Sequence, residues 1–176
     1  LADHLDCNLM TLYSENFVSG SYKSNAIDDG KRALRSVILK LISCRDSGKT
    51  AEIQFEQSNT MQEQLSALGC LVEFGKPNIH LQKFFMQWQS ERLVIDKWFA
   101  IQIVRSHPND TIDKIDALTK HPLFDMLTPN RFRAVFGSLI ANSVAFHQES
   151  GIGYAKLADW IIQLDSQNPQ TAARIC

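Results

Sequence analysis

The chain has 176 residues, a length that fits one domain or two very small ones. Hydrophobic residues make up 44% and charged residues 21%, which is ordinary for a globular protein and excludes collagen-like and low-complexity chains. The net charge is −1, with −1 on residues 1–88 and 0 on residues 89–176. Because no half or tail is basic, nucleic acid is not expected as a partner.

No stretch approaches the run of about 18 apolar residues that crosses a bilayer, so no membrane partner is expected. The start of the chain lacks the basic and apolar regions of a signal peptide, and it also lacks an initiator Met. We therefore expect the chain to be part of a longer protein. The four cysteines, Cys7, Cys44, Cys70 and Cys176, form no CxxC pair, which predicts reduced and mostly buried thiols in a cytoplasmic protein.

Apolar residues recur at helical spacing along almost the whole chain. In residues 31–42, for example, Leu34, Ile38 and Leu41 with Ile42 form one stripe. The same pattern predicts further helices at 60–72, 79–88, 93–104, 111–120, 129–140, 154–164 and from 169 to the end.

Several residues mark the starts of these helices. Thr60 and Glu63 have the spacing of a capping box. Asp110 is expected to cap the helix at 111–120. Thr128 and Asn168 each precede a proline, the order expected for an N-cap followed by the first helical residue.

No segment shows the alternating pattern of a β-strand. Short breaks rich in glycine and proline separate the predicted helices, which favours antiparallel helix pairs. The sequence therefore predicts an all-α fold, a superhelix of antiparallel helix pairs similar to HEAT or armadillo repeats. We expect residues 1–176 to form a single domain.

Catalytic and metal-binding motifs are not found. Gly48-Lys49-Thr50 is similar to the end of a P-loop, but Ser43 stands where the first glycine is needed and a predicted helix precedes it. The five histidines are scattered and include no His-Glu-x-x-His pair. No nucleophile elbow occurs, and no cysteine has a histidine close in sequence. We therefore expect no catalytic residue and no metal ligand in this chain.

Two helix starts carry polar groups with binding potential. Arg131 and Arg133 lie in the first turn after Thr128, where they are either plain surface charges or hold carboxylates or carbonyls of a neighbour. Gln170 and Arg174 are four residues apart and so share one side of a helix. Such a pair suits the carbonyl and carboxylate groups of a peptide, although spacing alone favours ordinary surface residues.

Several motifs, in one order and covering the chain from about Tyr13 to its end, are similar to those of a known family. The most specific run begins at His121-Pro122-Leu123-Phe124 and continues through Pro129-Asn130-Arg131-Phe132-Arg133, Ala145-Phe146-His147 and Gly151-Ile152-Gly153-Tyr154 to Asn168-Pro169-Gln170-Thr171-Ala172-Ala173-Arg174. Earlier matches are Gly30-Lys31-Arg32-Ala33-Leu34-Arg35, Asn59-Thr60-Met61 and the run from Leu93 to Gln102. The chain resembles the C-terminal domain of bacterial aminopeptidase N, the PepN-type zinc alanyl aminopeptidases.

The resemblance implies a parent enzyme that removes residues from peptide N-termini in the cytoplasm. The zinc of that family belongs to a separate catalytic domain with a His-Glu-x-x-His motif, which this chain lacks. The resemblance thus implies no cofactor in this chain and zinc in the parent.

For this domain the resemblance implies a supporting role. The domain would pack on the parent's catalytic domain, enclose the active-site cavity and limit the access of peptides. Gln170 and Arg174 would then be substrate-binding residues, with Arg174 on a carboxylate or carbonyl beyond the scissile bond. A freestanding helical repeat scaffold that binds a protein or peptide remains the alternative.

Overall fold

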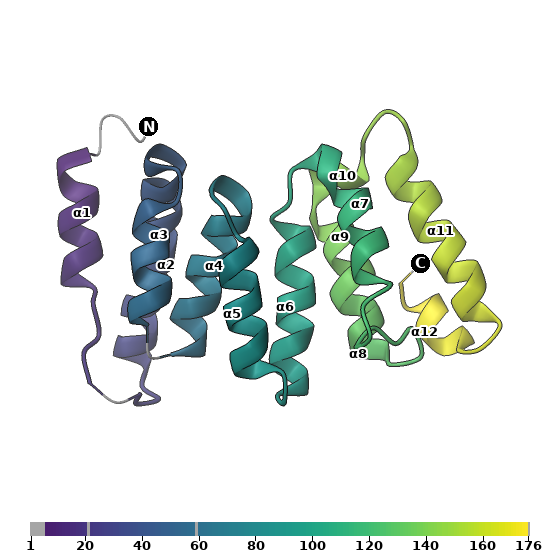
Figure 1. The fold of residues 1–176 in the computed structure, drawn as a ribbon, viewed down its shortest axis with the longest axis horizontal. Coiled ribbons are helices and arrows are strands. Elements are labelled where there is room, and N and C mark those ends of the chain that lie inside the picture. Colours follow the sequence, from purple (N-terminus) through teal and green to yellow (C-terminus); the bar gives the residue numbers. More distant parts are fainter. Residues whose placement is uncertain (1–5, 21, 59, 176) are drawn as a thin grey trace. The chain divides into compact units, whose positions relative to one another are not determined.

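The computed structural model describes residues 6–20, 22–58 and 60–175. Within these ranges every regular element is a helix and no strand occurs, which confirms the predicted all-α fold (Figure 1). The chain forms two compact units, one up to Phe84 and one from Phe85 onward. The expectation of a single domain stays a prediction.

The first unit consists of helices that follow one another with short links. Its elements are α1 (Asp6–Glu15), α2 (Ala26–Asp46), α3 (Lys49–Gln57), α4 (Met61–Phe74) and the first part of α5 (Asn78–Trp88). Helix α2 packs against α1, α3 and α4, and α3 packs against α4. The sequence pattern did not predict α1 or α3.

The turn between α2 and α3 is built around one carboxylate. The Asp46 side chain accepts hydrogen bonds from the backbone N–H groups of Gly48 at 2.9 Å and Thr50 at 2.8 Å. Gly48 has a φ of 82°, in the left-handed region that glycine enters without steric cost. The residues that are similar to a P-loop end therefore form a helix-to-helix turn.

Thr60 is the N-cap of α4, as predicted, and its hydroxyl also donates to the Glu63 carboxylate at 2.9 Å. The Thr60 side chain accepts a hydrogen bond from the Glu63 backbone N–H at 3.3 Å. The core of the first unit partly differs from the predicted stripe, because Ile38 is buried but Leu34 is 47% exposed and Leu39 is fully buried instead.

The second unit contains the remaining elements. They are the end of α5, α6 (Arg92–Val104), α7 (Pro108–Leu118), α8 (Pro129–Phe132), the π-helical segment η2 (Arg133–Gly137), α9 (Ser138–Ala141), α10 (Ser143–Phe146), α11 (Ile152–Asp165) and α12 (Pro169–Ala173). Helix α6 packs against α7, α9 and η2, and α11 packs against α12. Helices α6 and α7 run in opposite directions (Figure 1), as expected for a helix pair.

Two helix starts in this unit differ from expectation. Helix α7 begins at Pro108, and the side chain that caps it belongs to His107, whose Nδ1 accepts a hydrogen bond from a backbone N–H at 3.3 Å. Asp110 lies inside the first turn and is not the cap. Thr128 is the N-cap residue of α8 and Pro129 is its first residue, as predicted, but the Thr128 hydroxyl donates to the Asp125 carboxylate at 2.7 Å and makes no cap bond to the helix backbone.

The single helix predicted at 129–140 is interrupted by the π-helical segment η2. A π-turn widens the helix and shifts the phase of the residues that follow it. Phe132, Val135, Phe136 and Leu139 are all fully buried around this segment. Arg133, at its start, is exposed.

The thiol prediction is partly wrong. Cys70 is buried, but Cys44 of α2 is exposed, and neither forms a disulfide. The Cys7 side chain and Cys176 lie outside the described residues. Among the described helices, none is long and apolar enough to span a bilayer.

Candidate functional site

The short helix α12 presents the two residues that the sequence singles out. Asn168 is its N-cap, and the Asn168 side chain accepts a hydrogen bond from the Thr171 backbone N–H at 3.1 Å. The Asn168 backbone N–H donates to the Leu164 carbonyl at 2.6 Å, which ties the start of α12 to the end of α11. Thr171 and Ala172 are buried, so α12 is fixed along one side.

Gln170 and Arg174 both lie on the solvent-exposed part of this helix. Arg174 follows the last residue of α12 and keeps helical backbone angles, with φ of −82° and ψ of −12°. The Arg174 backbone N–H donates to the Thr171 carbonyl, three residues back, at 3.2 Å. Both side chains are exposed, and their placement on one side of the helix stays a prediction from their spacing.

Of the arginines in the first turn after Thr128, Arg131 is the buried one. Its Nε donates to the Asp96 carboxylate at 2.6 Å and its Nη1 donates to the Leu123 carbonyl. The guanidinium carbon also lies 4.6 Å from the centre of the Phe99 ring, within cation–π range. The prediction that these arginines hold carboxylates or carbonyls is confirmed for Arg131.

Arg133 differs from Arg131 in being exposed. Its guanidinium donates to the Asn130 side chain at 3.0 Å and to the Pro129 carbonyl at 3.3 Å. Both partners belong to the same helical stretch, so Arg133 remains a surface cation held close to its own backbone.

A cavity of about 350 Å³ opens beside Arg131, and the sequence pattern did not predict it. We call it the Arg131 cavity; its lining residues are Gln89, Arg92, Ile95, Pro122, Leu123, Asp125, Thr128 and Arg131. The residues come from the turn after α5, the first part of α6, and the segment that leads into α8 together with α8 itself. No local spacing connects these three places, so only the folded chain reveals the cavity.

Two titratable groups near this cavity have shifted pKa values. Hydrogen bonds from the Thr128 hydroxyl and the Leu127 backbone N–H lower the pKa of Asp125. Burial, together with the nearby positive charge of Arg131, lowers the pKa of His121. Asp125 is therefore negatively charged and His121 neutral at pH 7.

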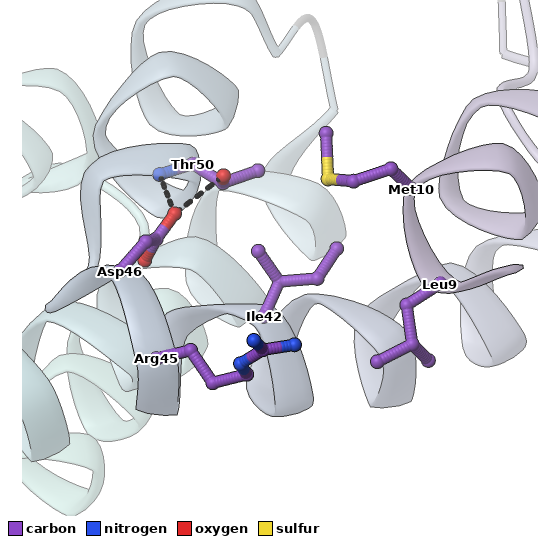
Figure 2. A pocket seen from close by; sticks show the side chains of 6 residues that line it. All are labelled: Leu9, Met10, Ile42, Arg45, Asp46 and Thr50. Carbon is purple, nitrogen blue, oxygen red and sulfur yellow. Dashed lines mark hydrogen bonds between the residues drawn. The ribbon is translucent and has the colours of Figure 1, made fainter. Parts of the chain in front are cut away.

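The first unit has a more apolar cavity of about 280 Å³ (Figure 2). Leu9 and Met10 of α1 face Ile42 of α2 across it, and Arg45 stands at its edge. The Asp46 carboxylate also lines the cavity but is occupied by hydrogen bonds from Gly48 and Thr50. Because α1 was not predicted, this cavity was not predicted either.

A zinc centre does not fit the part of the chain that the structure describes. Among the described residues, no group of three or more His, Cys, Asp or Glu side chains is placed to hold a metal ion. Structural and catalytic zinc sites need three or four such ligands around one point. No step of a reaction is therefore assigned to a metal bound here.

Short, packed helix pairs in the described residues define a helical repeat protein of the armadillo class. The chain belongs to the family described as Domain of unknown function (DUF3458_C) ARM repeats, whose model matches residues 1–176. This match confirms the HEAT- or armadillo-like fold class predicted from the sequence.

The chain is also similar in sequence and in structure to several aminopeptidases. The chain is 36% identical to aminopeptidase N of Caulobacter vibrioides and 32% identical to aminopeptidase N of Escherichia coli, in each case over 99% of this chain and 21% of the relative. The solved structure of Legionella pneumophila aminopeptidase A in complex with aspartic acid matches with a TM-score of 0.89 and 31% identity, over 99% of this chain and 22% of that chain. The chain thus spans about a fifth of the length of these relatives. The resemblance to aminopeptidase N inferred from the motifs is confirmed.

Proposed function

We propose that the chain is the non-catalytic, helical C-terminal domain of a zinc aminopeptidase that acts in the cytoplasm. In the longer protein it packs on the catalytic domain, encloses the active-site cavity and limits the access of peptides. The parent enzyme removes residues from peptide N-termini, and its zinc is held outside this chain.

The observation that carries the proposal is the match of almost the entire chain to about a fifth of aminopeptidase N, at 36% identity. The lack of a metal-binding cluster among the described residues is compatible with a supporting domain. A repeat domain of this class offers a broad surface for contact with a larger partner, here the catalytic domain of the same polypeptide.

Within this function Gln170 and Arg174 bind the part of the peptide beyond the scissile bond. Arg174 carries a permanent positive charge that suits the terminal carboxylate of a short peptide. Gln170 supplies both a hydrogen-bond donor and an acceptor, as a peptide backbone requires. The fixed backbone of α12, capped by Asn168, supports both side chains at low entropic cost.

The test uses the full-length enzyme with Arg174→Ala. We expect the KM for a tripeptide to rise about tenfold or more, because a hydrogen bond to a charged group is lost. The KM for an alanyl anilide should change much less, since the anilide has no groups at the distal position.

The matched control is Lys97→Ala, which removes an exposed positive charge from α6. This variant should leave the KM values of both substrates unchanged. If Arg174→Ala affects the tripeptide and the anilide equally, a role beyond the scissile bond is wrong.

The reading frame upstream of Leu1 distinguishes this function from a freestanding repeat scaffold. A frame that continues upstream into a His-Glu-x-x-His helix supports the proposed function. A start codon directly before Leu1 contradicts it and favours the scaffold.

A further inference from the structure

We propose that the Arg131 cavity binds a free α-amino acid with an apolar side chain. Neither Gln170 nor Arg174 lines this cavity, so the site is distinct from the peptide-binding residues proposed above. The inference does not depend on the proposed peptidase function.

The carboxylate of the amino acid meets two arginines. The Arg131 side chain is only 9% exposed, and its bonds to Asp96 and Leu123 use Nε and Nη1. The hydrogens of Nη2 remain for a ligand, on a guanidinium group that is already fixed in place. Arg92, at the start of α6, adds a second, exposed guanidinium to the same cavity.

The ammonium group of the amino acid meets Asp125. Its two carboxylate oxygens accept one hydrogen bond each, from the Leu127 N–H at 2.9 Å and the Thr128 hydroxyl at 2.7 Å. A carboxylate offers about four acceptor positions, so about two remain for a bound ammonium group. The same two hydrogen bonds keep Asp125 negatively charged at neutral pH.

The charges of the cavity select a zwitterion. Asp96 compensates Arg131, which leaves one positive charge on Arg92 and one negative charge on Asp125. A ligand with only a carboxylate would leave Asp125 unpaired, and a ligand with only an ammonium group would leave Arg92 unpaired. An α-amino acid carries both charges close together and satisfies both residues.

The apolar lining accounts for the side chain of the ligand. Ile95 is 1% exposed, whereas Pro122 and Leu123 are exposed side chains that line the same cavity from the segment before α8. A volume of about 350 Å³ lies at the small end of the range for ligand sites, which suits one amino acid better than a large cofactor.

The test is calorimetric and NMR titration of the 176-residue chain with L-leucine, N-acetyl-L-leucine and L-leucinamide. N-acetyl-leucine lacks the ammonium charge, and leucinamide lacks the carboxylate. L-Leucine should bind at a single site and shift the backbone amide signals of residues 89–95 and 122–131. The two analogues should bind about two- to fivefold more weakly, because each lacks an ion pair with one exposed side chain of the cavity.

Two variants test which residue of the cavity binds each charged group of leucine. Arg92→Ala should weaken leucine binding about two- to fivefold, since Arg92 is exposed, and Asp125→Asn should make leucine and N-acetyl-leucine bind with similar affinity. Lys97→Ala, an exposed cation on α6 that does not line the cavity, is the matched control and should bind leucine as the parent does. Equal binding of all three ligands, no saturable binding of leucine, or unchanged binding in Arg92→Ala would overturn the proposal.

Discussion

Arg131 and Asp96 form an ion pair that is largely buried, with Arg131 Nε 2.6 Å from Asp96 Oδ1 and side chains that are 9% and 17% exposed. The pair joins α8 to α6, and the second bond of Arg131, to the Leu123 carbonyl, holds the segment between α7 and α8. One side chain therefore organises the wall of the Arg131 cavity.

Replacing Arg131 with methionine should strongly destabilise the protein. The change leaves the Asp96 carboxylate without its partner in a largely buried place, and breaking such a pair costs about 3 kcal/mol. Urea denaturation followed by circular dichroism measures the free energy of unfolding. Arg133→Ala, which removes an exposed arginine two residues away, should change it by less than about 0.5 kcal/mol.

The double variant Arg131→Met with Asp96→Leu completes the comparison. Since it removes both charges, its loss of stability should be clearly smaller than the sum of the two single losses. Additive losses would show that the two charges do not interact, and the role assigned to this pair would be incorrect.

Two glycines should respond to alanine in opposite directions. A Cβ atom on Gly153, in α11, would lie 2.6 Å from the Phe146 carbonyl oxygen and 2.9 Å from the Phe146 Cα. Backbone atoms cannot yield as a flexible side chain can, so Gly153→Ala should lower the free energy of unfolding by about 1–3 kcal/mol.

Gly30 lies inside α2, and a Cβ atom there would meet nothing within 4 Å. Alanine is about 1 kcal/mol more favourable than glycine in a helix interior, so Gly30→Ala should raise the free energy of unfolding by about that amount. Thermal and urea denaturation of both variants provide the measurement. The same sign of change for both would contradict the packing described at Gly153.

The stability of the protein should decline when His121 takes up a proton. Its neutral ring accepts a hydrogen bond from the Leu123 N–H at 3.1 Å and packs edge-on against Phe85 and Phe99. Burial and then the charge of Arg131 lower its pKa in the folded state below the unfolded value of about 6.5. The unfolded chain therefore binds the proton more readily.

This difference fixes the sign of the pH effect. The effect of His121 protonation on the free energy of unfolding is absent well above pH 6.5, where the ring is neutral in both the folded and the unfolded state. It lowers stability as the pH falls below about 6.5 and becomes constant below the folded pKa. Comparing the free energy of unfolding at pH 7.5 and 5, His121→Asn should lose less stability than the parent protein.

If His121→Asn behaves like the parent, the environment described for His121 is not the cause of the pH dependence.

Local sequence patterns predicted the helices well where an apolar stripe and a cap coincide. Thr60 with Glu63 and Asn168 with its proline are examples, because each cap bond joins residues only three positions apart. Prediction failed where the apolar stripe was too short to stand out, and where two nearby residues could each cap the same helix. Helices α1 and α3 were not predicted, and the cap of α7 is His107, whereas the sequence pattern predicted Asp110.

The sequence alone determined the helical class of the protein, the positions of most of its helices and the resemblance to part of an aminopeptidase. Only the tertiary structure decided that Arg131 is buried on Asp96, that Leu34 is exposed, and that residues of three separate segments line one cavity. The physical reason is the separation in sequence between the residues that interact. Helix formation depends on neighbours three or four positions away, whereas Arg131 and Asp96 stand 35 residues apart and meet only when the helices pack.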